Sequence, residues 1–138
     1  MKADFYLLLA TFLWGIWGFA DKMAVTRAHP YTVQWVYSIP YILFIPVWYV
    51  MSRKAAGGAS LDPEAAAWTI LASVASMAAM LFLFFALRSK PASIAMAMTA
   101  AYPLVTLGLA VIMKMEQLSA VKVGGMLLII LGVVLLWD

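Results

Sequence analysis

The sequence predicts an all-α integral membrane protein with five transmembrane helices. Two observations lead to this fold class. Of the 138 residues, 67% are hydrophobic and 11% are charged, whereas a soluble domain carries about 25% charged residues. The apolar residues also fall into five segments that approach the roughly 20 helical residues needed to cross a bilayer. Lipid rather than water is therefore expected to surround most of the chain.

The predicted helices follow one another through short connections, and we treat residues 1–138 as one domain. The third begins with three residues typical of a helix start: Asp62 as N-cap, Pro63 in the first helical position and Glu64 in the positively charged first turn. Pro91 and Ser119 play similar parts later in the chain. Aromatic residues near predicted helix ends fit the membrane interfaces: Trp48, Tyr49, Trp68 and Trp137. The five helices cover about 5–26, 31–51, 63–87, 91–113 and 119–137.

Several functional classes are not supported by the residue content. The chain has no cysteine and one histidine, His29, in a predicted loop. Few acidic residues fall inside the predicted spans, so no catalytic set or metal site assembles, and we expect neither an enzyme nor a bound cofactor. The net charge of +3 comes from basic residues scattered over short loops. Nucleic acid is therefore not an expected partner.

The distribution of loop cations gives almost no preference for one membrane orientation. Orientation normally follows an excess of Lys and Arg in cytoplasmic loops. With five helices, the side of the N-terminus holds Lys2, Arg53, Lys54, Lys114 and Lys122, and the opposite side holds Lys22, Arg27, Arg88 and Lys90. Two interpretations are open. Either the weak bias or the first helix sets one orientation, or copies insert both ways and pair antiparallel.

The second half of the chain contains a recognisable order of short motifs. It reads FFAL before a short loop, PAS at the start of the next helix, YPLVT within that helix and GMLLIILGV within the last. Near the N-terminus, Leu13-Trp14-Gly15 is followed by Lys22. This order resembles the EamA-type domain of the drug/metabolite transporter superfamily.

The resemblance implies one half of an inverted-repeat transporter of ten helices. It implies a secondary transporter of small metabolites that works by alternating access, as a homodimer with antiparallel subunits favoured, in the inner or plasma membrane. The small multidrug resistance exporters are also small dimers, but they use a glutamate midway along their first helix. The corresponding stretch here reads LATFLWGIWG and has no acid. The alternative function is a non-transporting membrane subunit or a component of a lipid-linked sugar flippase.

Lys22 is the first candidate for contact with a small-molecule substrate. It shares one helical face with Gly15 and Gly18, and a helical side chain leans toward the N-terminus. We therefore expect its ammonium over a space without side chains, where an anionic group or a carbonyl could bind. The alternative is a lysine that reaches the headgroups, with Asp21 as an interfacial acid. The adjacent stripe holds Trp14, Trp17 and Asp21. We expect the two tryptophans to contact the substrate as well; the alternative is a stripe that serves packing, with an interfacial acid.

The second predicted helix has a one-sided polar stripe made of Gln34, Tyr37, Ser38 and Tyr41. Such a stripe fits either an aqueous cleft or hydrogen bonding between helices. Prolines inside membrane helices release backbone carbonyls and are common at gating regions, and we expect that role for Pro40, Pro46 and Pro103. Around the last of these prolines, Thr99 and Tyr102 are candidates to line the substrate pathway. The alternative is that Pro103 makes a kink that serves packing alone.

Overall fold

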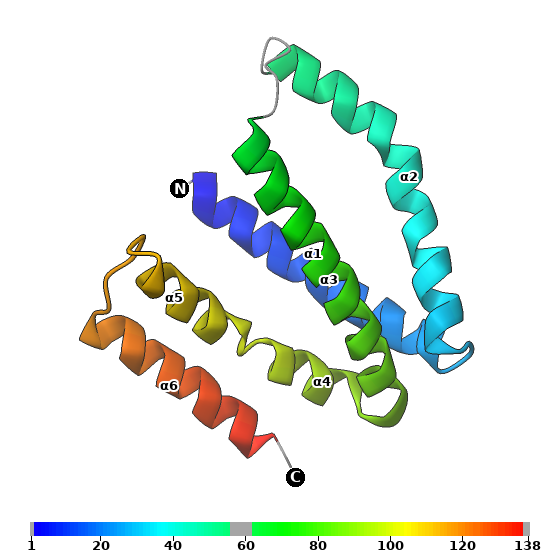
Figure 1. The fold of residues 1–138 in the computed structure, drawn as a ribbon. Helices are drawn as coiled ribbons and strands as arrows, with labels where there is room; N and C mark the ends of the chain where they lie inside the picture. The colour runs from blue at the N-terminus through cyan, green and yellow to red at the C-terminus, as the bar shows by residue number, and fades with distance from the viewer. Residues whose placement is uncertain (1, 56–61, 137–138) are drawn as a thin grey trace. The chain divides into compact units, whose positions relative to one another are not determined.

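The computed structural model describes residues 2–55 and 62–136, and no strand occurs among them. Figure 1 shows the helices in chain order. They are α1 (Lys2–Val25), α2 (Pro30–Ala55), α3 (Pro63–Ser89), α4 (Ala92–Thr99), α5 (Tyr102–Ile112) and α6 (Ala120–Leu135). The predicted all-α fold is confirmed.

The helices fit a membrane protein with five spans. Within the described residues, four apolar segments are long enough to cross a bilayer: Asp4–Val25, Pro30–Ala55, Pro63–Ser89 and Ala92–Ile112. The fifth predicted span corresponds to α6, a shorter apolar helix. Trp137, and residues 56–61 of the glycine-rich connection, lie outside the described residues.

Two predicted helix starts are made by side-chain caps. The Oδ2 atom of Asp62 accepts hydrogen bonds from the backbone N–H groups of Glu64 at 3.1 Å and Ala65 at 3.2 Å. The hydroxyl of Ser119 accepts from the N–H of Lys122 at 3.2 Å. Each cap satisfies N–H groups that have no partner inside the helix. These two N-cap predictions are confirmed.

The fourth predicted helix, over 91–113, is divided into α4 and α5 rather than continuous. Ala100 and Ala101 form a turn between them. Pro103 has no N–H to donate to the carbonyl of Thr99, and the N–H of Leu104 donates to Ala101, three residues back, at 3.0 Å. By contrast, Pro40 and Pro46 lie inside a continuous α2. The proline near the middle of the fourth span therefore marks a break, whereas those in α2 do not.

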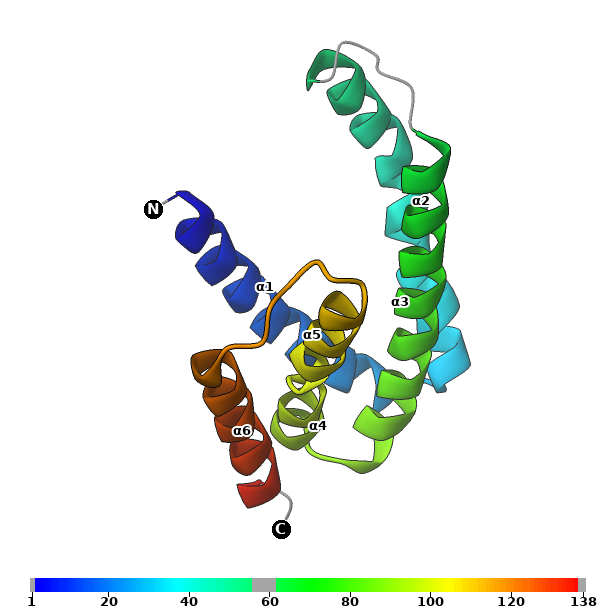
Figure 2. The same ribbon diagram turned by 60° about the vertical axis from the view of Figure 1, so that its left-hand side comes forward.

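The chain forms two compact units, which we describe separately. The first unit comprises Met1–Gly18 and Ser89–Asp138, and the second comprises Phe19–Arg88. In the first unit, α6 packs beside α4 (Figure 1 and Figure 2).

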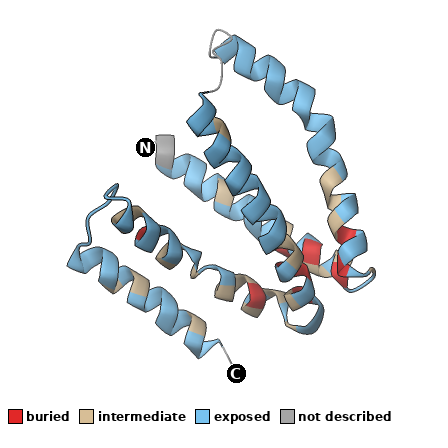
Figure 3. Ribbon diagram, viewed as in Figure 1, coloured by how far each residue is buried: buried red, intermediate tan, exposed pale blue. Residues whose placement is uncertain are grey.

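The core of the second unit lies where the end of α1, the start of α2 and the end of α3 meet (Figure 3). The aromatic ring of Tyr37 on α2 packs edge-on against Phe84 of α3, with centroids 5.8 Å apart. Phe84 and Leu87 are fully buried. Most large apolar side chains elsewhere along the helices are exposed, which suits a protein with lipid as its outer solvent. The buried residues of the second unit are Asp21, Val25, Pro30, Val33, Leu83, Phe84 and Leu87.

Candidate substrate-binding site

Lys22 ties the end of α1 to the end of α3 inside the second unit. Its Nζ atom donates a hydrogen bond to the carbonyl oxygen of Leu87. The last carbonyls of a helix have no intrahelical donor, and the residue four positions after Leu87 is Pro91, which has no N–H. The lysine therefore supplies a donor that the backbone cannot. This carbonyl is one of the two kinds of partner expected for Lys22 from the sequence.

The expectation of an empty space over both glycines of α1 is wrong at Gly18. In the first unit, a Cβ atom added to Gly18 would lie 2.9 Å from the Sδ atom of Met96, whose side chain fills the position. At Gly15 such a Cβ would meet nothing within 4 Å. Gly18 is thus a packing residue, because only a residue without a side chain lets Met96 approach the backbone this closely.

The polar stripe of α2 is held in place partly by its own hydrogen bonds. The hydroxyl groups of Tyr37 and Tyr41 lie 2.9 Å apart and share a hydrogen bond. The hydroxyl of Ser38 donates to the backbone oxygen of Gln34 at 3.0 Å. Ser38 is therefore satisfied inside the helix. The tyrosine pair presents a linked set of hydroxyls that can donate to or accept from a bound molecule.

An aromatic hollow of about 490 Å³ opens along α2, within the size range of small-molecule sites. Beyond the tyrosine pair, the rings of Phe44 and Trp48 stack with centroids 6.0 Å apart. The hollow combines a mainly apolar wall with the two tyrosine hydroxyls, which suits a small amphiphilic molecule. Its lining residues are Val36, Tyr37, Pro40, Tyr41, Phe44 and Trp48. Three of them were predicted as site residues; Pro46, in the same helix, does not line it.

Gln34, in the second unit, does not line this hollow. The other predicted site residues belong to the first unit and do not share a described hollow: Trp14, Trp17, Thr99, Tyr102 and Pro103. Trp14 and Tyr102 are more than half exposed, at 56% and 59%. The hydroxyl of Thr99 donates to the backbone oxygen of Met96 at 2.8 Å, so it is satisfied within its helix. Trp17 is half-buried, and Pro103 stands next to the break between α4 and α5.

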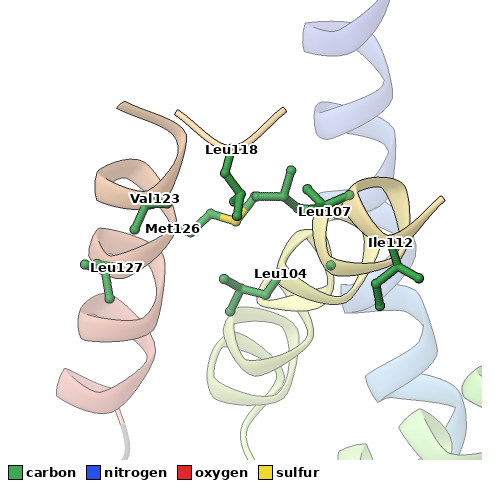
Figure 4. A pocket seen from close by; sticks show the side chains of 9 residues that line it. Leu104, Leu107, Ile112, Leu118, Val123, Met126 and Leu127 are labelled. Atoms are coloured by element: carbon green, nitrogen blue, oxygen red, sulfur yellow. The ribbon is translucent and has the colours of Figure 1, made fainter. Parts of the chain in front are cut away.

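A second hollow, of about 410 Å³, lies between α5 and α6 (Figure 4). Its walls are aliphatic side chains, one methionine and one glycine, and no predicted site residue takes part. Binding sites for small molecules use a few polar groups to orient the ligand, and this lining has no polar side chain. We therefore do not assign the substrate to it.

Asp21 is the residue whose surroundings the sequence did not reveal. It is 5% exposed, and its Oδ2 atom has no hydrogen-bond partner among the described residues. Two other buried polar atoms share that condition, Nε1 of Trp17 and Oε1 of Gln34. The available signal was an Asp–Lys pair in a largely apolar stretch of α1, about one turn before the end of the helix. Among the described residues, no group of three His, Cys, Asp or Glu side chains is arranged to hold a metal ion.

Comparison with protein-family models matches residues 1–137 to the EamA-like transporter family. The match runs from the start of the chain through the end of α6, so it includes both units and every predicted site residue. Searches of curated proteins and of solved structures gave no match. The resemblance inferred from the order of short motifs is therefore confirmed at the level of the family.

Proposed function

The chain belongs to the EamA-like transporter family, and from this premise we propose that it is a secondary transporter of small metabolites. The observation that carries the proposal is the family match over residues 1–137. The apolar helices make the chain a multi-pass membrane protein, and we place it in the inner or plasma membrane. Transport by such proteins needs no covalent chemistry, in keeping with the lack of any motif for a nucleophile or phosphate site in the sequence.

We assign substrate contact first to the aromatic hollow of α2. The rings of Phe44 and Trp48 would cover the apolar part of the molecule, and the hydroxyls of Tyr37 and Tyr41 would orient its polar part. Tyrosine suits this role because it has an apolar body with a polar tip. Lys22 supports the arrangement by holding α1 against α3, on which Tyr37 also packs. The substrate class is therefore a small amphiphilic metabolite.

We also propose that two copies work together as an antiparallel homodimer. The support is the near-balance of cations on the two sides, five against four, or four against three without Lys22 and Lys122 of α1 and α6. Either count leaves little reason for one orientation. Many transporters are built from two inverted repeats around a central site, and rocking of one repeat against the other exposes that site to each side in turn. Two oppositely inserted copies would provide the same symmetry, with the substrate pathway along their seam.

Flux through purified protein tests the transport proposal. Liposomes containing the full chain would be loaded with a mixture of amino acids and small organic acids, and the release of each would be followed by mass spectrometry. We expect release of at least one compound above protein-free liposomes, and loss of that release in Tyr41→Ala. Tyr49→Ala is the matched control, because Tyr49 is exposed on the same helix and does not line the hollow.

Orientation of the chain tests the dimer proposal separately. A reporter active only in the cytoplasm and one active only outside it would each be fused to the C-terminus. Activity of both would support copies inserted in opposite directions. Activity of one alone would refute self-pairing in antiparallel form. If flux were also absent, a non-transporting membrane subunit would become the better description.

A further inference from the structure

The core of the second unit holds a buried carboxyl group, one oxygen of which has no hydrogen-bond partner among the described residues. Asp21 is 5% exposed, and it is the one charged residue among the buried residues that the structure describes. Its Oδ2 atom accepts no hydrogen bond from any described residue. A carboxylate buried without compensation is costly, and most of all inside a membrane span. Such residues in membrane proteins commonly belong to ion or substrate pathways.

The basic residues that lie near Asp21 in the sequence donate hydrogen bonds to backbone carbonyls. Lys22 donates to the carbonyl of Leu87. Consecutive residues of a helix project about 100° apart, so Lys22 and Asp21 lie on different faces of α1. Arg27 donates from Nη1 to the backbone oxygen of Met23 at 2.9 Å. His29, in the connection to α2, has its ring among aromatic side chains, 6.0 Å from that of Phe85. The other charged group at this end of the unit is Arg88, in the last turn of α3.

A second buried acceptor belongs to the same helix ends. The Oε1 atom of Gln34, in the second turn of α2, is buried and has no hydrogen-bond partner among described residues. The bond from Lys22 to Leu87 and the packing of Tyr37 on Phe84 hold α1 and α2 against the same end of α3. The second unit therefore has two buried oxygen atoms with no hydrogen-bond partner among the described residues, Oδ2 of Asp21 and Oε1 of the half-buried Gln34, and the first can carry a negative charge. Oxygen ligands of this kind suit a small cation or an N–H donor.

We propose that Asp21 exchanges its carboxyl proton for one monovalent cation, with Gln34 as a second oxygen ligand. In the exchange the O–H proton leaves to solvent, and the cation pairs with the resulting carboxylate, so the net charge of the site does not change. The cation has two sources with the same chemistry, an alkali ion that couples transport or the ammonium group of a substrate. Its use in transport rests on the proposed function, but the binding itself does not.

Labelling by a hydrophobic carbodiimide tests the proposal without any need for flux. The reagent adds to protonated carboxyl groups in apolar surroundings, and its site is read by peptide mass spectrometry. The full chain would be labelled in liposomes in a salt-free, sucrose-balanced buffer. We expect the label on Asp21 but not on Asp62 and Glu64, the exposed carboxyls at the start of α3. We expect no label on any residue of the Asp21→Asn variant. No label on Asp21 would overturn the proposal.

Added cations then separate the two sources. Sodium, potassium or methylammonium chloride would be compared with magnesium chloride at equal ionic strength. Slower labelling with an alkali ion identifies a coupling ion, and slower labelling with methylammonium alone identifies a substrate ammonium. Labelling that no monovalent cation slows would overturn the exchange.

The role of Gln34 has its own matched variants. In Gln34→Leu, half-protection of Asp21 should need roughly tenfold more cation, because one hydrogen bond or ligand to a charged group is lost. Gln117→Leu, in the connection between α5 and α6, should leave protection unchanged. Equal protection in both variants would remove Gln34 from the site.

The labelling and flux experiments also separate the cation site from the proposed function. Protection of Asp21 in a protein without flux would count against the transport proposal alone. Flux without labelling of Asp21 would count against the cation site alone.

Discussion

Replacing Lys22 by methionine should destabilise the second unit as well as affect transport. The change keeps the length and the apolar stem of the side chain but removes the ammonium that donates to the carbonyl of Leu87. Leu87 is fully buried, and the α-helical donor for its carbonyl would be Pro91, which has none. The carbonyl in the variant would therefore lose a donor that neither water nor the helix readily replaces.

The size of the effect follows from the kind of bond. A hydrogen bond that involves a charged group contributes about 1.5–3 kcal/mol, and leaving a buried acceptor unsatisfied costs a similar amount. Because Lys22 is half-buried, we expect a loss of about 2 kcal/mol in the free energy of unfolding. That loss corresponds to a change of roughly thirtyfold in the folding equilibrium.

Unfolding in mixed micelles with increasing detergent denaturant, followed by far-UV circular dichroism, measures this loss. Lys22→Arg should recover most of it, because the guanidinium keeps a donor in reach. Lys54→Met is the control, since Lys54 is exposed in the last turn of α2. If Lys22→Met and Lys54→Met unfold with the same free energy as the native chain, the bond to Leu87 does not stabilise the unit and our reasoning about it fails.

Three further variants test contacts described above, each by the same unfolding assay. Gly18→Leu should lower the free energy of unfolding by about 1–3 kcal/mol, because the new side chain overpacks against Met96. Adding Met96→Ala to this variant should restore part of the loss. An equal loss in Gly15→Leu, where the space is open, would disprove the packing role of Gly18. Ser119→Ala should cost about 1 kcal/mol through loss of the N-cap of α6, while an unchanged stability would mean that water replaces the cap. Glu116→Gln breaks the 2.6 Å ion pair between Glu116, 46% exposed, and Lys122, 43% exposed. The free energy of unfolding should fall by no more than about 1 kcal/mol, and by less at high salt. A larger loss would show that the pair is coupled to other interactions.

The spans and their starts could be predicted because they depend on local properties of the sequence. An apolar segment of sufficient length has to become a helix in lipid, since every backbone group needs a partner within the segment. The caps at Asp62 and Ser119 depend on residues within three positions. The polar stripe of α2 could be predicted for the same reason, because residues three and four positions apart share one face of a helix. Tyr37 and Tyr41 were expected as neighbours on that face.

What could not be predicted depends on contacts between distant residues. The donor from Lys22 reaches Leu87, 65 residues away, and the closeness of Met96 to Gly18 depends on the packing of α1 and α4 within the first unit. The burial of Asp21 has the same origin, because one helix alone would place this acid near the membrane surface. A proline in a span can bend a helix or interrupt it, and the neighbouring residues of Pro40 and Pro103 do not distinguish the two outcomes.

The shortness of α6 has a consequence for the lipid around the protein. At 1.5 Å per residue, α6 is about 24 Å long, whereas the span Ala92–Ile112 reaches about 32 Å and α2 and α3 each reach about 40 Å. One bilayer with a hydrocarbon layer of about 30 Å has to accommodate these lengths. Long helices adapt by tilting, and short ones by drawing the two leaflets together. Lipids with short acyl chains should therefore gather around α6, and the membrane is expected to be thinnest beside this helix.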